Sequence, residues 1–143
     1  MNIVDLIALF EGYRARAYHC SEGYPTIGYG KKLGPKGAPL DFYQLEVSER
    51  VAKFWLEEDI RELAPVANTL CPGLDGVRHG ALISMVYQMG ERGVKKFKKM
   101  LSALAAGDWQ RAHDEALDSV WANQTPHRAQ KTAIMLLTGE WPA

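Results

Sequence analysis

The fold of this chain is decided by one stretch near its start, Glu11-Gly-Tyr-Arg-Ala-Arg-Ala-Tyr-His-Cys20-Ser-Glu-Gly-Tyr-Pro-Thr26-Ile-Gly-Tyr-Gly30. The stretch has no helical period. Aromatic and β-branched residues are mixed in it with glycine and proline, which is typical of short strands joined by turns. Its centre, Ser21-Glu22-Gly23, has the composition of a tight turn. The residues from Tyr13 to Gly34 therefore predict a β-hairpin lobe.

A short helix is expected before the hairpin, and a loop after it. Ile3, Leu6, Ile7 and Phe10 fall at i, i+3, i+4 and i+7, the spacing of one apolar helix face. We expect this helix to end near Glu11-Gly12, so that Glu11 lies in its last turn beside the hairpin. The residues from Gly34 to Pro39 have the glycine and proline content of a loop.

Helical patterns fill the rest of the chain. Ser48 is a candidate N-cap for a long helix that fades near Pro65 or beyond. The stretch from Val77 to Met89 is apolar on nearly every face, which predicts a buried central helix that Gly90 stops. Three more helices are expected: one with Val94, Phe97, Leu101 and Leu104 on one face before Gly107, one capped by Asp108, and one from Thr125-Pro126 to about Gly139.

Composition narrows the classes of function. The formal net charge is zero, which offers no overall attraction to nucleic acid, and no apolar run approaches the roughly 20 residues of a membrane span. The segment from Met1 to Asp5 does not have the pattern of a secretory signal, so we expect synthesis and retention inside the producing cell. Cys20 and Cys71 are expected as free thiols. The four histidines show no metal-ligand spacing, and no phosphate-binding loop is present.

Three residues of the hairpin region are candidates for chemistry. Glu11 is a candidate general acid, Cys20 a candidate thiol group and Thr26 a hydroxyl that both donates and accepts hydrogen bonds. Taken singly, each has an ordinary alternative as a solvated carboxylate, a small buried side chain or a strand residue. Their spacing, Glu11-x8-Cys20-x5-Thr26, is what makes them a motif.

That motif lies within Glu22-Gly-Tyr-x-Thr-Ile-Gly-x-Gly30 and resembles the catalytic segment of the phage-type lysozymes. Cys20 stands where the T-even phage pattern has aspartate. Two further blocks resemble the same family, Ala81-Leu-Ile-Ser-Met-Val-Tyr-Gln-Met-Gly-Glu91 as its buried central helix and Trp121-Ala-Asn-Gln-Thr-Pro-His-Arg-Ala129 as the entry to its C-terminal helix. The resemblance spans almost the whole chain and is weakest from Lys31 to Gln44.

The resemblance implies an α+β, mostly α fold, with a small β-hairpin lobe and a larger helical lobe joined by a long helix. Residues 1–143 would form one lysozyme-like catalytic domain. Its small lobe would cover about 13–47, its connecting helix about 48–66, and its helical lobe about 66–143 together with helix 1–11. Peptidoglycan would lie in the cleft between the lobes, and an endolysin of this kind would hydrolyse the β-1,4 bond between N-acetylmuramic acid and N-acetylglucosamine without a cofactor.

The resemblance also implies roles for single residues. Glu11 would donate a proton to the leaving oxygen, Thr26 would position the attacking water, and Cys20 would assist without forming a lasting covalent bond. Lys32 stands where the T-even relative has an apolar residue. The remaining residues carried over are an orienting arginine, Arg128, and four substrate contacts, Glu22, Tyr87, Gln88 and Gln124. For two of these an alternative stays open, in which Tyr87 packs in the core and Gln124 only supports a turn.

Two other functions stay open on the sequence alone. A cysteine-dependent peptidoglycan peptidase or amidase would use Cys20 as nucleophile with His127 or His79 as base, and an inactive wall-binding module would keep the cleft without turnover. As a lysozyme, the protein is expected to be a monomer in the host bacterial cytoplasm. It would reach the cell wall through a separate pore protein once the membrane is permeable, and it would not itself insert into the membrane. A basic cluster, Arg92, Lys95, Lys96, Lys98 and Lys99, is either a solvated face or a site for anionic polymers or membranes.

Overall fold

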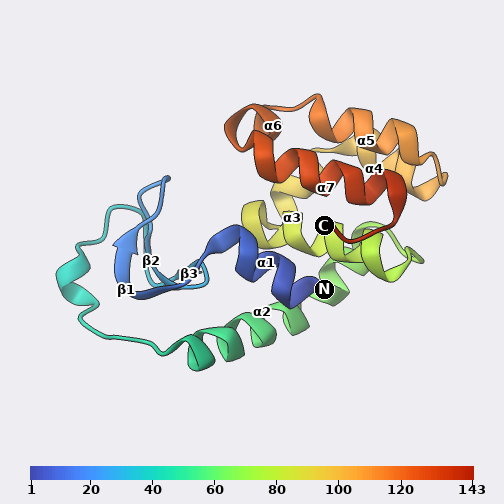
Figure 1. The fold of residues 1–143 in the computed structure, drawn as a ribbon. Helices are drawn as coiled ribbons and strands as arrows, with labels where there is room; N and C mark the ends of the chain where they lie inside the picture. Colours follow the sequence, from blue (N-terminus) through green and yellow to red (C-terminus); the bar gives the residue numbers. More distant parts are fainter. The chain divides into compact units, whose positions relative to one another are not determined.

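A computed structural model describes residues 1–143, which divide into two compact units. One unit comprises residues 4–60, and the other comprises residues 1–3 with 61–143 (Figure 1). All strands belong to the first unit, and the second is helical. The mostly helical α+β class predicted from the sequence is confirmed. No helix combines the length and the apolar character needed to cross a bilayer.

The unit of residues 4–60 holds a three-stranded antiparallel sheet in the order β1-β2-β3. The predicted hairpin is therefore confirmed, with a short third strand added. Helix α1 ends at Glu11 because Gly12 takes φ +71° and donates its N–H to the carbonyl of Ala8 at 2.9 Å. The elements are α1 (Ile3–Glu11), β1 (Arg14–His19), β2 (Pro25–Gly28), β3 (Lys31–Lys32), the 3-10 helix η1 (Leu40–Phe42) and the first part of α2 (Glu49–Leu70).

The first turns of α2 lie against the sheet. A Cβ atom at Gly28 would come 3.0 Å from that of Ala52, so glycine allows the close approach of strand and helix. The Tyr29 hydroxyl donates to Oε1 of Glu49 at 2.7 Å. This hydrogen bond, together with burial, raises the pKa of Tyr29 to about 12. Ile27 is fully buried beneath these contacts.

Helix α2 starts as predicted and runs further. The Ser48 hydroxyl accepts a hydrogen bond from the N–H of Val51 at 3.2 Å, which confirms the cap. The helix continues through Pro65 to Leu70, past the expected end near 66. Proline removes one backbone donor, but the apolar face goes on beyond it to the fully buried Ala67, and that burial keeps the helix together.

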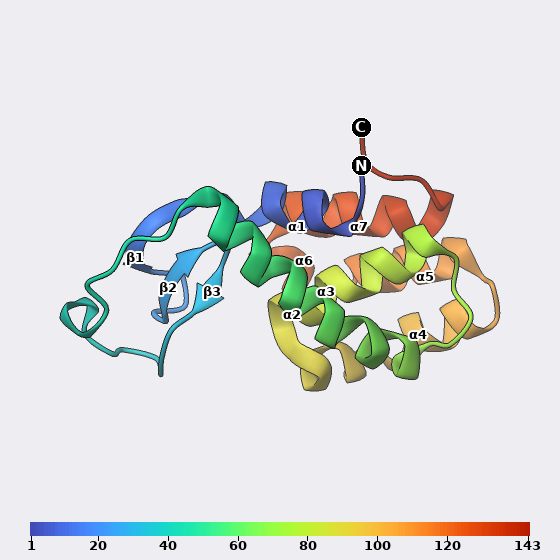
Figure 2. The ribbon, with the colours of Figure 1, turned by 90° about the horizontal axis from the view of Figure 1, so that it is seen from below.

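The helical unit is built around α3 and α7. Its central helix is buried as predicted, with every residue from Gly80 to Val86 inaccessible or nearly so. Helix α7 packs against α3, α5 and α6, and α4 packs against α5 (Figures 1 and 2). The helices are α3 (Gly76–Lys95), α4 (Lys98–Ala105), α5 (Trp109–Leu117), α6 (Val120–Gln124) and α7 (Pro126–Thr138).

Two local predictions in this unit hold. Gly90 interrupts helical geometry with φ +77° and ψ 167°, and the chain resumes a helix after this kink. The Asp108 carboxylate accepts from the N–H of Arg111 at 3.2 Å and so caps α5. Thr125 precedes α7 as expected, although its hydroxyl bonds back to the carbonyl of Trp121 at 3.2 Å instead of capping.

One expected helix is wrong. Val94 belongs to the last turn of α3, and α4 begins only at Lys98, because Phe97 takes the non-helical values φ −81° and ψ 55°. The ring of Phe97 meets that of Trp121 edge-on, with 5.9 Å between centroids. This long-range aromatic contact is absent from any local pattern. The short helix α6, capped by the Ser119 hydroxyl, is an element that the periodicity analysis missed.

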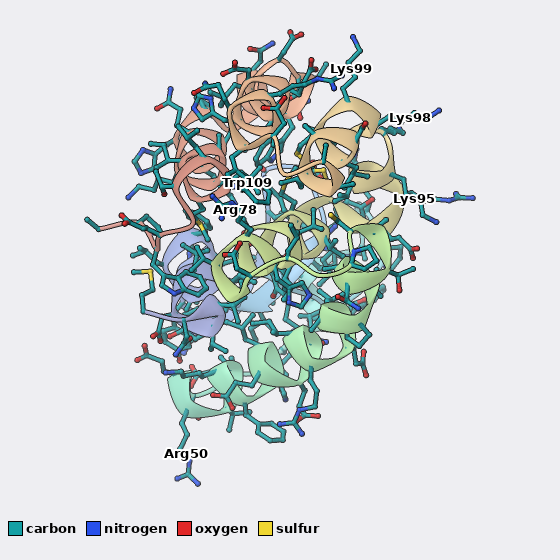
Figure 3. The ribbon with its side chains drawn as sticks, turned by 90° about the vertical axis from the view of Figure 1, so that its right-hand side faces the viewer. Arg50, Arg78, Lys95, Lys98, Lys99 and Trp109 are labelled. Atoms are coloured by element: carbon teal, nitrogen blue, oxygen red, sulfur yellow. The ribbon has the colours of Figure 1, made fainter.

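Arg78 ties three helices of this unit together. Its guanidinium lies over the ring of Trp109 in α5, 3.9 Å from the centroid (Figure 3). It also donates to the carbonyls of Leu136 and Leu137 in α7, at 2.8 and 3.0 Å, and pairs with Asp75 at 3.0 Å. Carbonyls in the last turn of a helix lack partners within that helix, so the guanidinium satisfies groups that would otherwise need water.

Candidate active site

Glu11 ends α1 and is half-buried against the turn that joins β2 and β3. Its carboxylate lies so close to the backbone of Gly30 that a Cβ atom there would come 2.6 Å from Oε2. Gly30 also has φ +75°, a conformation that other residues rarely adopt. Glycine at this position therefore forms the turn and leaves the space that the Glu11 carboxylate fills.

Cys20 and Thr26 belong to the same face of the sheet. Thr26 pairs with Tyr18 across β1 and β2, and the N–H of Cys20 donates to the carbonyl of Tyr24 at 3.0 Å, which continues the ladder by two residues. Side chains alternate along a strand, so Tyr18, Cys20 and Thr26 emerge on one side. The predicted turn between them is confirmed by a hydrogen bond from the N–H of Gly23 to the carbonyl of Cys20 at 2.8 Å.

Thr26 is only 2% exposed, and its hydroxyl is held in a defined direction. The hydroxyl donates to the carbonyl of Tyr24 at 2.8 Å. It also lies within hydrogen-bond reach of Cys20. A hydroxyl carries a single proton. While Thr26 donates that proton to the carbonyl of Tyr24, its oxygen can only accept a hydrogen bond from the Cys20 thiol. The Thr26 hydroxyl rotates to donate to Cys20 only when Cys20 is a thiolate.

The two cysteines are both free thiols, as expected, but their environments differ. Burial raises the pKa of Cys71. Burial also acts to raise the pKa of Cys20, but the backbone N–H groups of Tyr24 and Glu22, the Thr26 hydroxyl and the positive charge of Lys32 outweigh it, and the pKa falls below its ordinary value. Of the two cysteines, Cys20 is therefore the more acidic.

Tyr18 is a residue of this site that the sequence analysis missed. Burial raises the pKa of its phenol, and the charges of Glu11 and Cys20 raise it further, so both groups lie near the ring. Arg14 opposes them, with its guanidinium 4.5 Å from the ring centroid. The i, i+2 spacing of Tyr18 and Cys20 in the predicted hairpin was the signal that could have revealed it.

The other predicted residues fall in two places. Glu22 is exposed in the turn of the hairpin. In the helical unit, Gln88 accepts from the indole N–H of Trp121 at 2.8 Å and reaches the Thr125 hydroxyl at 3.5 Å, so it braces α3 against α6. Arg128 in α7 extends Nη2 to the carbonyl and hydroxyl oxygens of Ser84 in α3, at 3.4 and 3.3 Å.

Tyr87 is half-buried on α3, and Gln124 is exposed at the end of α6. Gln88, Gln124 and Arg128 thus gather where α3, α6 and the start of α7 meet. Glu11, Cys20 and Thr26 gather around the sheet of residues 4–60. Their roles in binding and catalysis stay predictions.

Two features bear on the rival functions. Within residues 4–60 the single histidine is His19, and its Nε2 is hydrogen-bonded to the carbonyl of Ala38 at 2.9 Å instead of pairing with Cys20. No group of three or more histidine, cysteine or acidic side chains is placed to hold a metal ion.

The basic cluster is exposed, with Lys95, Lys98 and Lys99 extending outward (Figure 3), and Val94 and Met100 on the inner side are buried.

Glycoside hydrolases use a carboxylic acid as proton donor together with a second group, usually a carboxylate, that activates water or attacks the sugar, and here Glu11 is a carboxylic acid beside Cys20 and Thr26. The family model for phage lysozyme matches residues 8–133, and the chain therefore belongs to the phage lysozyme family. It is a lysozyme-type glycoside hydrolase, and its substrate class is the peptidoglycan of the bacterial cell wall.

Individual relatives agree with this assignment. Probable T4-type lysozyme 1 of Dictyostelium discoideum is 28% identical over 96% of this chain and 95% of its own length. The pre-baseplate central spike protein Gp5 of Enterobacteria phage T4 is 32% identical over 97% of this chain, but the match spans only 28% of that longer protein. An endolysin of Acyrthosiphon pisum secondary endosymbiont phage 1 is 28% identical over 77% of this chain and 71% of its own length.

Proposed function

We propose that the chain is a muramidase that hydrolyses the β-1,4 bond between N-acetylmuramic acid and N-acetylglucosamine, with Glu11 as the general acid. The observation that carries the proposal is the position of the Glu11 carboxylate, seated on Gly30 and near Tyr18 on the sheet face of Cys20 and Thr26. Glycoside hydrolysis with water attack requires an acid on one side of the sugar and groups that bind the attacking water on the other side.

The reaction follows a water-attack course with inversion. Glu11 gives its proton to the glycosidic oxygen, and the bond between that oxygen and the sugar C1 breaks. A water molecule forms the new bond to C1 and passes a proton to the base that holds it. Thr26 accepts a hydrogen bond from this water, and Cys20, in its thiolate form, takes up the proton of the water and becomes a thiol without bonding to the sugar. Proton exchange with solvent then returns Glu11 to its acid form and Cys20 to its starting form.

The sugar contacts are proposed from the resemblance. Glu22 on the hairpin turn, Tyr87 and Gln88 on α3 and Gln124 at the end of α6 would bind the glycan, and Arg128 would orient Glu11. For Gln88 the brace is a second role, since it uses the amide oxygen for Trp121 and one amide N–H for Thr125, and the second N–H stays available.

The biological role proposed is that of an endolysin, which lyses the host cell from within. It is supported by the similarity to a phage protein named endolysin. The protein would act as a monomer without a nucleic-acid partner, and a separate pore protein would admit it to the wall once the membrane is permeable. Cysteine-dependent peptide cleavage, with Cys20 as nucleophile and His127 or His79 as base, is less well supported, because Nε2 of His79 is engaged with the carbonyl of Ala64 at 3.0 Å.

The test is digestion of purified peptidoglycan with wild type and Glu11→Gln. We expect new reducing sugar ends from the wild type, no new amino groups, and a loss of about 100-fold or more in Glu11→Gln, because the amide keeps the shape but donates no acidic proton. The control is Glu57→Gln, which removes an exposed carboxylate on α2. New amino groups, or near-normal cleavage by a folded Glu11→Gln, would refute the assignment.

A further inference from the structure

A lysine of the short strand β3 lies on the same row of the sheet as the candidate site. Lys32 pairs with Thr26 across β2 and β3, and Thr26 pairs with Tyr18 across β1 and β2. Residues paired in this way share one face of a sheet. The row Tyr18, Thr26, Lys32 therefore crosses the sheet beside Cys20, which follows Tyr18 at the alternate position.

Lys32 is exposed, but its ammonium is held over this face. Its Nζ lies 4.2 Å from the centroid of the Tyr24 ring, within cation–π distance. Tyr24 is also the residue whose carbonyl accepts from the Cys20 N–H. The preceding residue, Lys31, goes the other way and pairs with Asp59 of α2 at 3.0 Å. Lys31 and Lys32 are adjacent in β3, so their side chains point to opposite faces of the strand.

The charges around Cys20 come from several elements. Burial opposes its ionisation, and the N–H groups of Tyr24 and Glu22, the Thr26 hydroxyl and Lys32 lower its pKa. Lys32 is the cationic side chain among them. The other titratable groups nearby are Tyr18 on β1, Glu22 in the turn, Glu11 at the end of α1 and Lys36, whose side chain packs 3.7 Å from where a Cβ atom of Gly23 would lie.

We propose that Lys32 is a positioning residue of the reaction, whose ammonium, held over Tyr24, keeps Cys20 as a thiolate that accepts the proton of the attacking water. The inference rests on the role proposed above for Cys20. An aspartate at this position would be ionised at neutral pH without help, whereas a thiol of ordinary acidity is mostly protonated there. A neighbouring cation offsets that difference, and at the moment of attack the proton passes from water to sulfur.

The first measurement follows the thiol directly and needs no glycan cleavage. Alkylation of Cys20 by iodoacetamide is followed against pH, and mass spectrometry of the peptide distinguishes Cys20 from the buried Cys71. In Lys32→Met the midpoint should move to higher pH, in Lys32→Arg it should stay near that of the wild type, and in the control Lys36→Met it should not move. Salt at about 0.5 M should raise the wild-type midpoint, because an exposed charge is screened.

The second measurement is cleavage of peptidoglycan against pH. In Lys32→Met the acidic limb of kcat should move by the same amount as the alkylation midpoint, with a loss of about two- to fivefold near neutral pH, the size typical of an exposed charge pair. In a Cys20→Asp background the same substitution should change kcat less than it does with Cys20 present, since an aspartate ionises unaided.

The outcomes separate this inference from the function on which it rests. An unchanged alkylation midpoint in folded Lys32→Met overturns the inference, whatever the cleavage data show. A shifted midpoint with an unshifted kcat profile also overturns it, because the thiolate would then not be the base. If the wild type cleaves no glycan, the proposed muramidase function fails, and the role of Lys32 in the reaction fails with it.

Discussion

At the scale of single residues, Cys20 stands where the T-even phage pattern has aspartate, so in the proposed site a conditional charge would take the place of a fixed one. Cys20 is neutral or charged depending on its neighbours, and four of them favour the charged form against burial. Three roles have been considered for it: a substitute for a carboxylate, a covalent nucleophile or a packing residue. They differ in which substitutions should keep activity.

Under the water-attack course, Cys20→Asp should retain substantial cleavage, because a carboxylate also accepts a proton from water. Cys20→Ala should lower kcat by about 10- to 100-fold without abolishing it, since Thr26 still holds water and Glu11 still donates its proton. Reducing-end assays on both variants, with circular dichroism to check folding, provide the measurement. Two folded and inactive variants would contradict this course and favour a nucleophilic thiol.

Gly30 allows the acid to be tested without changing it. We expect Gly30→Ala to cut cleavage at least tenfold, since a Cβ atom 2.6 Å from the Glu11 carboxylate must displace it and a displacement of about 1 Å is costly in catalysis. The control is Gly37→Ala, which has a similar φ of +82° but nothing within 4 Å of the added atom. Both should lose about 1–2 kcal/mol in urea denaturation from backbone strain alone. Equal activity in the two variants would show that the Gly30 contact does not position Glu11.

At the scale of elements, the helical unit depends on contacts between helices that are distant in sequence. Arg78 of α3 touches a ring of α5 and the last carbonyls of α7. Gln88 of α3 bonds the indole of α6. Such polar contacts help to fix how the helices pack, because each buried donor or acceptor left without a partner would cost free energy.

Arg78→Met should therefore destabilise the helical unit. Methionine has an apolar chain of similar length to that of arginine, but it loses the cation–π contact and the hydrogen bonds to Leu136 and Leu137. We therefore expect the free energy of unfolding to fall by about 2–3 kcal/mol. Urea denaturation followed by far-ultraviolet circular dichroism measures it. Arg92→Met, on the exposed basic cluster, is the control and should change the free energy of unfolding by less than about 0.5 kcal/mol. A similar small change in both variants would mean that the Arg78 contacts contribute little.

At the scale of the whole molecule, the proposed reaction uses only side chains and water. Dialysis against a chelator should therefore leave the rate of cleavage of purified peptidoglycan unchanged, within the error of the assay. The measurement compares the dialysed enzyme with the same enzyme after addition of Mg²⁺, Ca²⁺ or Zn²⁺. A reproducible loss on dialysis that one of these ions restores would require a different mechanism.

The sequence by itself determined the features that depend on a few neighbouring residues. The end of α1 at Glu11, the hairpin turn before Gly23 and the cap at Asp108 were all predicted, since each needs only a glycine or a short polar side chain at the right place. The motif of Glu11, Cys20 and Thr26 was recognised from its resemblance to the catalytic segment of the phage-type lysozymes, and its three members lie within one hairpin and the helix end before it.

Only the tertiary structure decided which distant groups act on those residues. It broke the expected helix at Phe97 to seat that ring against Trp121, and it carried α2 past Pro65 on a continuing buried face. It also added Tyr18 and Lys32 to the surroundings of Cys20. Strand register and helix packing bring together residues that are separate in sequence, so the direction in which the pKa of Cys20 shifts was open until the fold placed its neighbours.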